Sequence, residues 1–413
     1  MKMTISSRYA LRSLLRHKRR TLLSVIGIGV GCAVCLIMVS FVRGESEMMM
    51  RAAANSGTGH LRVASEEWLK TREKDLRLGE NWRDLLADIR EMDVAAAAPH
   101  ARTDAFLAIG TRTAGVVMVG VDPAAEPKLN RLVRDVTEGQ YLTPKDAGRV
   151  VIGRAIAKRL DVGVGDALMV TVSGKNGEMR GAMLSVAGIV ATGSEELDAG
   201  VCHVLLAEVE EITGYEGAAE ISILLKDHGR INAVAERLRE MAGPGEVVVK
   251  WDHILPELAS GVEVDETWTN LMVGLVVIVV FLGIASAQLA AVLERRKEFA
   301  VLSAIGMKGG QLVRIMLAEG AILGVAGALL ALAVGLPLVL LLAEYGIDFS
   351  SLYGEADLAV SNVLIDPIIY GEVGWWLLPL AVGLSLIATT LSSLYPAWYA
   401  LGTDPANALR VEQ

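Results

Sequence analysis

The chain has 413 residues, of which 53% are hydrophobic, and its formal net charge is −9. The length exceeds that of an ordinary single domain, and the apolar fraction indicates a membrane protein. The longest polar region, residues 44–267, is acidic on balance, which argues against nucleic acid as a partner.

The first 20 residues are basic and amphipathic. Leu11, Leu14 and Leu15 share an apolar side, whereas Arg12 and Arg16 lie elsewhere on the helical wheel. We expect residues 1–20 to form a cytoplasmic helix in the membrane interface, with its arginines among anionic lipid headgroups.

Four runs are long enough to cross a bilayer, which needs about 20 mostly apolar residues. The predicted spans are residues 21–43, 268–293, 315–343 and 375–401. A secretory signal has an apolar core of about 7–15 residues. The first run is longer, so we predict an uncleaved anchor. We expect it to continue outward as a polar helix over residues 44–54.

Basic residues cluster before the first span and again in residues 294–314. The positive-inside rule places both clusters in the cytoplasm. Four spans then leave both chain ends inside, including residues 402–413. Residues 44–267 and a loop at residues 344–374 lie outside.

The outer region is predicted to be of mixed α/β type. Segments with strand and helix patterns lie near its ends, at about 57–122 and 218–255, and they flank a Gly-rich stretch of short β-like runs, about 123–217. We therefore predict an α+β membrane protein with four transmembrane helices. Between the first two helices it carries a large extracytoplasmic α/β domain, which is split by a β-rich insertion.

The three cysteines do not indicate a disulfide framework. Cys32 and Cys35 fall inside the first span and Cys202 outside it. The C-x-x-C spacing puts the first two on one helix face. Small residues at a helix contact are the favoured interpretation, since a redox or metal role needs water and further ligands.

Motifs for catalysis are missing from the sequence. It has no G-x-x-x-x-G-K-[ST] loop for ATP, no H-E-x-x-H and no G-x-S-x-G. His203 beside Cys202 is typical of an ordinary strand, and Gly163-Val164-Gly165-Asp166 of a β-turn. We expect neither an enzyme nor a bound cofactor.

Glu319 is the only acid in the third span, about one turn from Arg314 at the predicted cytoplasmic rim. Acids inside membranes are candidate proton relays. A structural contact with headgroups or with Arg314 is the other, favoured interpretation.

The connector between the second and third spans, residues 294–314, begins with a charged, amphipathic string. An apolar ridge at spacings i, i+3 and i+6 follows the charges, and a glycine ends the pattern. The candidate residues are Glu294, Arg295, Arg296, Glu298, Phe299, Leu302, Ala304, Ile305 and Gly306. Both ends are tethered to spans, which suits a mechanical input, although charge alone indicates only a positive-inside loop.

The detailed string resembles E-R-R-x-E-[IF]-x-x-[LM]-x-A-[IL]-G of ABC-transporter permeases in the MacB, LolCDE and FtsX superfamily, the type VII ABC transporters. Residues 10–23 are similar to the family's A-L-R-N-L-x-R-x-K-x-R-T-x-L, and residues 317–320 to its L-x-E-G. Residues 395–410 are similar to its C-terminal Y-P-A-x-x-A-x-x-x-x-P-x-x-A-L-R. The outer region resembles the lipoprotein-release branch of this superfamily at residues 57–63, 119–123, 138–142, 151–157 and 251–258.

The resemblance implies a mechanism. A separate ATPase dimer, which binds ATP and Mg²⁺, would drive two permease chains, identical or homologous, in the inner membrane. Residues 294–306 would be the coupling helix. The outer region would combine a porter-like part, at about 57–122 and 218–255, with a sabre-like insert at 123–217.

The cargo implied is a lipoprotein released from the membrane without a channel. Three alternatives stay open. These are an exporter of peptides, antibiotics or lipids, a regulator of a periplasmic enzyme, and a sensor without an ATPase, which the coupling-type string argues against.

Overall fold

The computed structural model describes residues 16, 18–71, 73, 76–294, 301, 307, 309–353, 358–360 and 363–401. The chain divides into two compact units. The helical unit takes in the chain up to Glu45, Glu263–Ile347, and the chain from Ile369 onward. The α/β unit comprises Ser46–Val262 and Asp348–Ile368.

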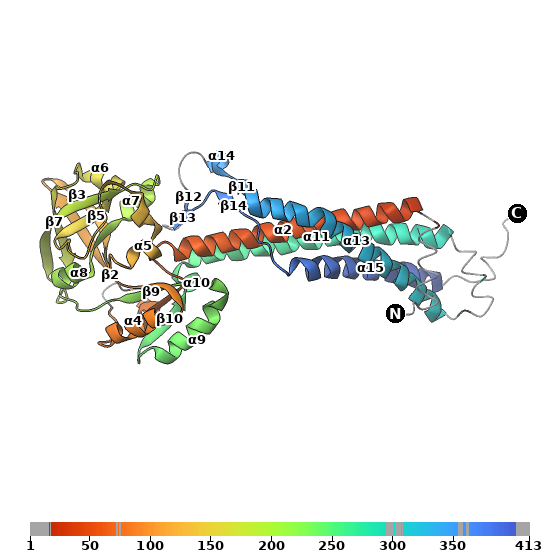
Figure 1. The fold of residues 1–413 in the computed structure, drawn as a ribbon, viewed down its shortest axis with the longest axis horizontal. Helices are drawn as coiled ribbons and strands as arrows, with labels where there is room; N and C mark the ends of the chain where they lie inside the picture. Colours follow the sequence, from red (N-terminus) through yellow and green to blue (C-terminus); the bar gives the residue numbers. More distant parts are fainter. Residues whose placement is uncertain are drawn as a thin grey trace. The chain divides into compact units, whose positions relative to one another are not determined.

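Four long helices are apolar enough to cross a membrane, which confirms the predicted number of spans within the part of the chain described (Figure 1). Their bounds are Lys18–Ala54 (α2), Pro256–Glu294 (α11), Gly309–Tyr345 (α13) and Leu377–Leu401 (α15).

α2 and α11 extend well beyond the apolar runs that predicted them, and α13 extends slightly beyond its run. α2 begins at Lys18, inside the predicted N-terminal segment, and continues through the polar residues after Arg43 to Ala54. α11 begins at Pro256, since proline is favourable in the first helical turn, and so includes the polar stretch before Trp268. Each is therefore one continuous helix that is apolar over part of its length.

Small residues line the contact between α13 and α15. A Cβ at Gly320 would collide with Ser393 Oγ, and one at Gly324 would lie 2.5 Å from Thr389 Oγ1. Ser385 Oγ also donates a hydrogen bond to the carbonyl of Gly324, at 2.6 Å. Close backbone approach and such hydrogen bonds drive helix association in lipid.

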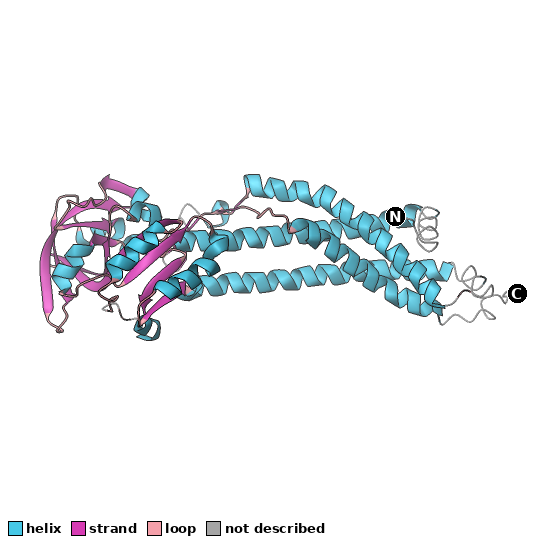
Figure 2. Cartoon of the chain, turned by 60° about the horizontal axis from the view of Figure 1, so that its bottom comes forward, coloured by secondary structure: helices cyan, strands magenta, loops and turns pink. Residues whose placement is uncertain are grey.

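The α/β unit is built on a ten-stranded mixed sheet (Figure 2). The strand order is β10-β1-β9-β2-β3-β8-β5-β7-β4, with β6 paired to β2 and β7. The strands are Leu61–Ser65 (β1), Val94–Ile109 (β2), Arg112–Val121 (β3), Val136–Gly139 (β4), Arg149–Gly153 (β5), Ala167–Ser173 (β6), Met179–Val190 (β7), Cys202–Leu205 (β8), Glu220–Leu225 (β9) and Glu246–Lys250 (β10).

The first lobe of this unit is an open antiparallel sheet covered by helices. β10, β1, β9 and the start of β2 pair side by side. Helices α4 (Trp82–Glu91) and α9 (Ile231–Met241) pack Ile89 and Leu238 against Leu61 and Ile223 of the sheet. The buried face of α4 carries Trp82, Leu85, Leu86 and Ile89.

The second lobe is a closed barrel. The pairings run in a ring, from β2 through β3, β8, β5, β7 and β6 back to β2. Leu107, Met118, Val170 and Leu184 fill its interior together with side chains of α6 (Arg154–Leu160) and α8 (Leu206–Thr213). Such a small barrel encloses a packed core rather than a pore.

The barrel moves the boundary expected from the sequence. The insertion was predicted to start at residue 123, after both β2 and β3. Closure needs the second half of β2 and all of β3 as staves, so the barrel core begins near Ala101. β2 is 16 residues long and serves both lobes.

The segment between α13 and α15, predicted as a plain loop, contains ordered structure. It includes Ile347–Asp348 (β11), Ser350–Tyr353 (α14), Leu358–Val360 (β12), Val363–Ile365 (β13) and Ile368–Ile369 (β14). β12 and β13 form an antiparallel pair, and most of the segment belongs to the α/β unit.

The contact between α13 and α15 generates a prediction. Gly324→Val should lower the thermal unfolding midpoint of the purified protein, because overpacking a tight contact costs about 1–3 kcal/mol. Gly383→Val on α15 is the matched control, since a Cβ there meets nothing within 4 Å. Equal midpoints for the two variants would contradict the packing described.

Candidate functional site

Most of the predicted coupling residues lie outside the described part of the chain. Arg295, Arg296, Glu298 and Phe299 are among these, as are Leu302, Ala304, Ile305 and Gly306. Their role therefore stays a prediction. Glu294, at the C-terminal end of α11, is the one candidate of this string that the structure describes.

Glu294 contacts the first helix. Its carboxylate lies 3.5 Å from Nη1 of Arg20, whose side chain is 27% exposed. The pair joins the ends of α2 and α11 that the positive-inside rule places in the cytoplasm. The sequence analysis did not anticipate this contact, although opposite charges at the same predicted ends of two spans were an available signal.

The two predicted rim residues lie on α13. Arg314 is exposed and Glu319 is half-buried. Glu319 directly precedes Gly320, at the contact with α15. A contact of Glu319 with headgroups or Arg314, and a role in proton transfer, both stay hypotheses.

Cys32 and Cys35 are buried and form no disulfide in the structure. Cys32 packs with Ile28, Ile284 and Leu323 from three helices. This environment agrees with the favoured interpretation of small residues at a helix contact.

In the α/β unit, buried polar groups gather where β2 passes from the first lobe to the barrel. His100 Nε2 lies 2.7 Å from Glu126 Oε2, and its Nδ1 lies 3.2 Å from Ser222 Oγ. Asn130 donates to the other oxygen of Glu126, at 3.0 Å. Burial alone would raise the pKa of Glu126, but the His100 charge and these hydrogen bonds bring it down to about 2.

A second ionic cluster lies beside the first. Oε2 of Glu220 lies 2.8 Å from Nη1 of Arg62, and its Oε1 lies 3.0 Å from Nε of Arg102. Burial acts to raise the pKa of Glu220, and the two guanidinium groups outweigh it, so that the pKa is about 2. Since a buried pair is costly to break, the two clusters fix the junction of the lobes.

Ser222, His100 and Glu126 have the connectivity of a catalytic triad. Their environment excludes that role, because Ser222 is fully buried in β9 and His100 is 1% exposed. A substrate cannot reach the hydroxyl, and a hydrolase needs its nucleophile open to substrate. The three residues are a structural network.

The network also meets the end of α2. Gly57 N donates to the carbonyl of Leu129 at 3.0 Å, and Arg131 N to that of Asn55 at 2.8 Å. Gly59 then has φ +73°, and a Cβ there would lie 2.6 Å from the carbonyl oxygen of Ile223, so only glycine fits this turn. The end of the helix is thus joined to both lobes.

His203 lies in barrel strand β8, as expected for an ordinary strand residue. Its Nδ1 is 2.8 Å from the hydroxyl of Tyr141. Burial lowers the pKa of His203 to about 4, and burial likewise lowers that of His60 to about 4. Both rings are therefore neutral at physiological pH, and Tyr141 is positioned to donate to His203.

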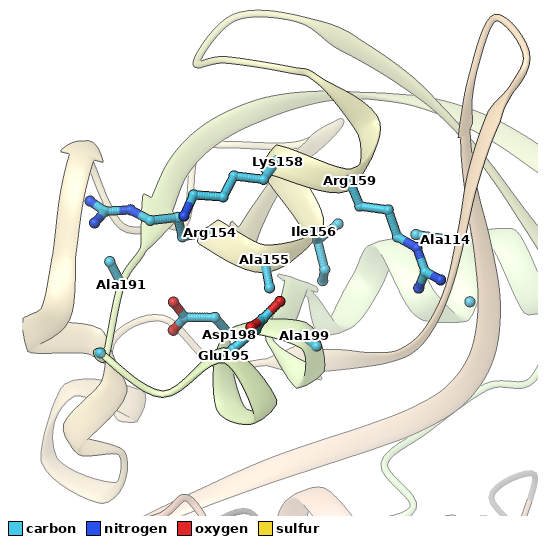
Figure 3. A pocket seen from close by; sticks show the side chains of 12 residues that line it. Ala114, Arg154, Ala155, Ile156, Lys158, Arg159, Ala191, Glu195, Asp198 and Ala199 are labelled. Carbon is cyan, nitrogen blue, oxygen red and sulfur yellow. The ribbon is translucent and has the colours of Figure 1, made fainter. Parts of the chain in front are cut away.

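A surface cavity of about 860 Å³ lies between α6 and α7 (Glu195–Gly200) of the barrel (Figure 3). Arg154, Lys158 and Arg159 extend from α6, and Glu195 and Asp198 from α7. Oδ1 of Asp198 already accepts hydrogen bonds from the amide and the hydroxyl of Thr192. The lining contains no nucleophile paired with a base, and the described residues contain no group of metal ligands.

Comparison with known families places this architecture. The profile of the MacB-like periplasmic core domain matches residues 21–241, and that of the FtsX-like permease C-terminal domain matches residues 270–405. The chain belongs to the ABC-transporter permeases that combine these two domains, as its sequence motifs predicted. Members of this family are transport subunits rather than catalysts.

Individual relatives align over almost the whole chain. The lipoprotein-releasing system transmembrane protein LolC of Xylella fastidiosa is 23% identical and covers 96% of this chain and 97% of its own length. LolE of Haemophilus influenzae is 23% identical over 94% of this chain and 93% of its own. The uncharacterized ABC transporter permease YknZ of Bacillus subtilis is 21% identical over 98% of each.

The buried groups of the α/β unit predict a pH dependence. His60 and His203 have folded pKa values of about 4, below their ordinary 6.5, so their contribution to stability is complete above pH 6.5 and is lost as the pH falls towards 4. Glu126 and Glu220, with folded pKa values of about 2 against an ordinary 4.5, add a further loss between pH 4.5 and 2.

His203→Gln should reduce the slope of unfolding free energy against pH between 6.5 and 4 by about one proton, because glutamine does not titrate. Chemical denaturation at several pH values measures the slope. The exposed His253→Gln is the control. An unchanged slope in His203→Gln would contradict the burial of a neutral ring.

Proposed function

We propose that the chain is the transmembrane subunit of an ABC transporter that converts ATP hydrolysis on a separate ATPase dimer into movement of its α/β unit, and that it releases lipoproteins from the inner membrane. The resemblance to LolC and LolE over more than nine-tenths of each chain is the observation that carries the cargo. ATP and Mg²⁺ would bind the ATPase, and this chain would bind no cofactor.

The mechanical part of the proposal rests on continuous helices. α2 and α11 are 37 and 39 residues long, and about 20 residues suffice to cross a bilayer. Each continues without a break into residues of the α/β unit. A displacement of the cytoplasmic end would therefore be carried along an unbroken hydrogen-bonded rod.

The cytoplasmic end supplies the proposed input. The connector from Glu294 to Gly306 would sit in a groove of the ATPase and move with it. The Arg20–Glu294 ion pair would link that movement to α2 as well as α11. The basic clusters before the first span and in residues 294–314 favour an orientation in the inner membrane with both chain ends in the cytoplasm and the α/β unit in the periplasm.

A second candidate function is export of peptides, antibiotics or lipids. The match to a domain described as MacB-like keeps this candidate open, and the full-length similarity to YknZ, an uncharacterized ABC transporter permease, shows that such similarity is not confined to lipoprotein-releasing proteins. The two candidates share the ATPase, a paired permease chain and the coupling helix, and they differ in cargo.

The coupling assignment predicts a separation of two activities. Glu298→Lys or Gly306→Pro should lower cargo released per ATP hydrolysed by about five- to a hundredfold, the range of ordinary coupling energies, and leave the α/β unit folded. Glu266→Lys, the same charge reversal at an exposed position of α11, is the control. Normal release per ATP in both connector variants would remove the assignment.

The cargo is tested by depletion. Cells that lose the chain should accumulate outer-membrane lipoproteins in the inner membrane, measured by fractionation and quantitative mass spectrometry. Normal lipoprotein sorting, combined with lost resistance to a peptide or antibiotic, would favour the exporter instead.

A further inference from the structure

We infer that the segment from Asp348 to Ile368 is a strap that fastens α13 and α15 to the α/β unit, with Arg131 and Asp366 as the positioning residues that fix it. This inference rests on the proposed permease function. It extends the mechanical path, since the long helices α2 and α11 alone would leave α13 and α15 outside it.

The strap is anchored first by apolar contact. Val363, Leu364 and Ile365 are 1%, 8% and 3% exposed. Ile365 packs with Ala53, in the last turn of α2, and with Leu258, near the start of α11. Side chains of Met49, Trp251 and Leu255 complete this cluster. The strap thus lies at the place where both long helices join the α/β unit.

An ion pair beside the apolar anchor fixes its position. Asp366 Oδ1 lies 2.6 Å from Nη1 of Arg131. The backbone of Arg131 donates to the carbonyl of Asn55, at the end of α2. Asp366 is therefore attached through one residue to the same helix end that Ile365 contacts.

The described residues of the strap pair with one another. Leu358 pairs with Ile365 and Val360 with Val363. The amide of Phe349 donates to the carbonyl of Pro367 at 2.9 Å, which closes the base of the segment. A connection that only returned the chain to the membrane would need neither a buried strand nor these internal bonds.

The consequence is that all four helices are linked to anchored residues of the α/β unit. α2 and α11 do so by continuity, and α13 and α15 through the strap. Loss of the strap should leave ATP hydrolysis intact while reducing the movement that reaches the α/β unit.

The test uses charge reversal in the complete complex with its ATPase. Arg131→Asp and Asp366→Arg should each lower lipoprotein release per ATP by about two- to fivefold, the scale of an exposed ion pair. The double swap should recover most of the loss. Ile365→Ser, which removes the apolar anchor, should lower lipoprotein release per ATP further than either charge reversal. Arg112→Asp, Asp161→Arg and their double swap are the matched controls, because that pair has the same 2.6 Å separation and lies on the barrel.

Hydrogen exchange supplies a readout that does not depend on cargo. In the wild type, the amides of residues 363–365 should be protected from exchange in both the nucleotide-free and the vanadate-trapped complex. Protection should fall in the single variants and should return in the double swap. The strap would be overturned if these amides were unprotected in either state of the wild type. It would also be overturned if the double swap showed no more protection than the two single variants. A wild type that releases no lipoprotein but keeps this exchange pattern would overturn the proposed cargo and leave the strap standing.

Discussion

The lipid bilayer imposes the constraint on which the rest of this structure depends. Backbone polar groups inside lipid must be satisfied within the chain, so the spans are helices, and a helix transmits displacement along its axis. α2 and α11 extend this rule beyond the apolar residues, because their polar ends continue the same hydrogen-bond ladder. The membrane-spanning residues of α2 and α11 are therefore continued into the α/β unit by helix rather than by flexible linkers.

Buried charge fixes the junction between the two lobes of the α/β unit. Glu220 between Arg62 and Arg102, and Glu126 beside His100, lie at the passage from the open sheet to the barrel. Burial works against both carboxylates, and their partners outweigh it, so these contacts are costly to break. The closed barrel has a packed core of its own.

Sequence reasoning succeeded where one rule dominates and failed where distant pairing decides. Apolar length predicted four helices, and the polar residues 44–54 were expected to continue the first span as a helix, which the bounds of α2 confirm. The barrel was missed because β2 and β3 gain their role only when β6 and β7, about 70 residues later, close the ring. His100 and Glu126 carried no local signal, since their contact is set by tertiary packing. The connector is the opposite case. Its sequence motif is easy to recognise, but residues 295–300 and 302–306 lie outside the described part of the chain.

The central claim, that ATP on a partner moves the α/β unit of this chain, is tested most directly by a distance measurement. Spin labels would be placed at Val164 on the barrel and Tyr345 at the end of α13, both exposed, in a chain whose native cysteines are replaced. Pulsed electron paramagnetic resonance of the complex should give different label-to-label distance distributions without nucleotide and after vanadate trapping. Superimposable distributions in the two states, from a complex that hydrolyses ATP, would contradict the account.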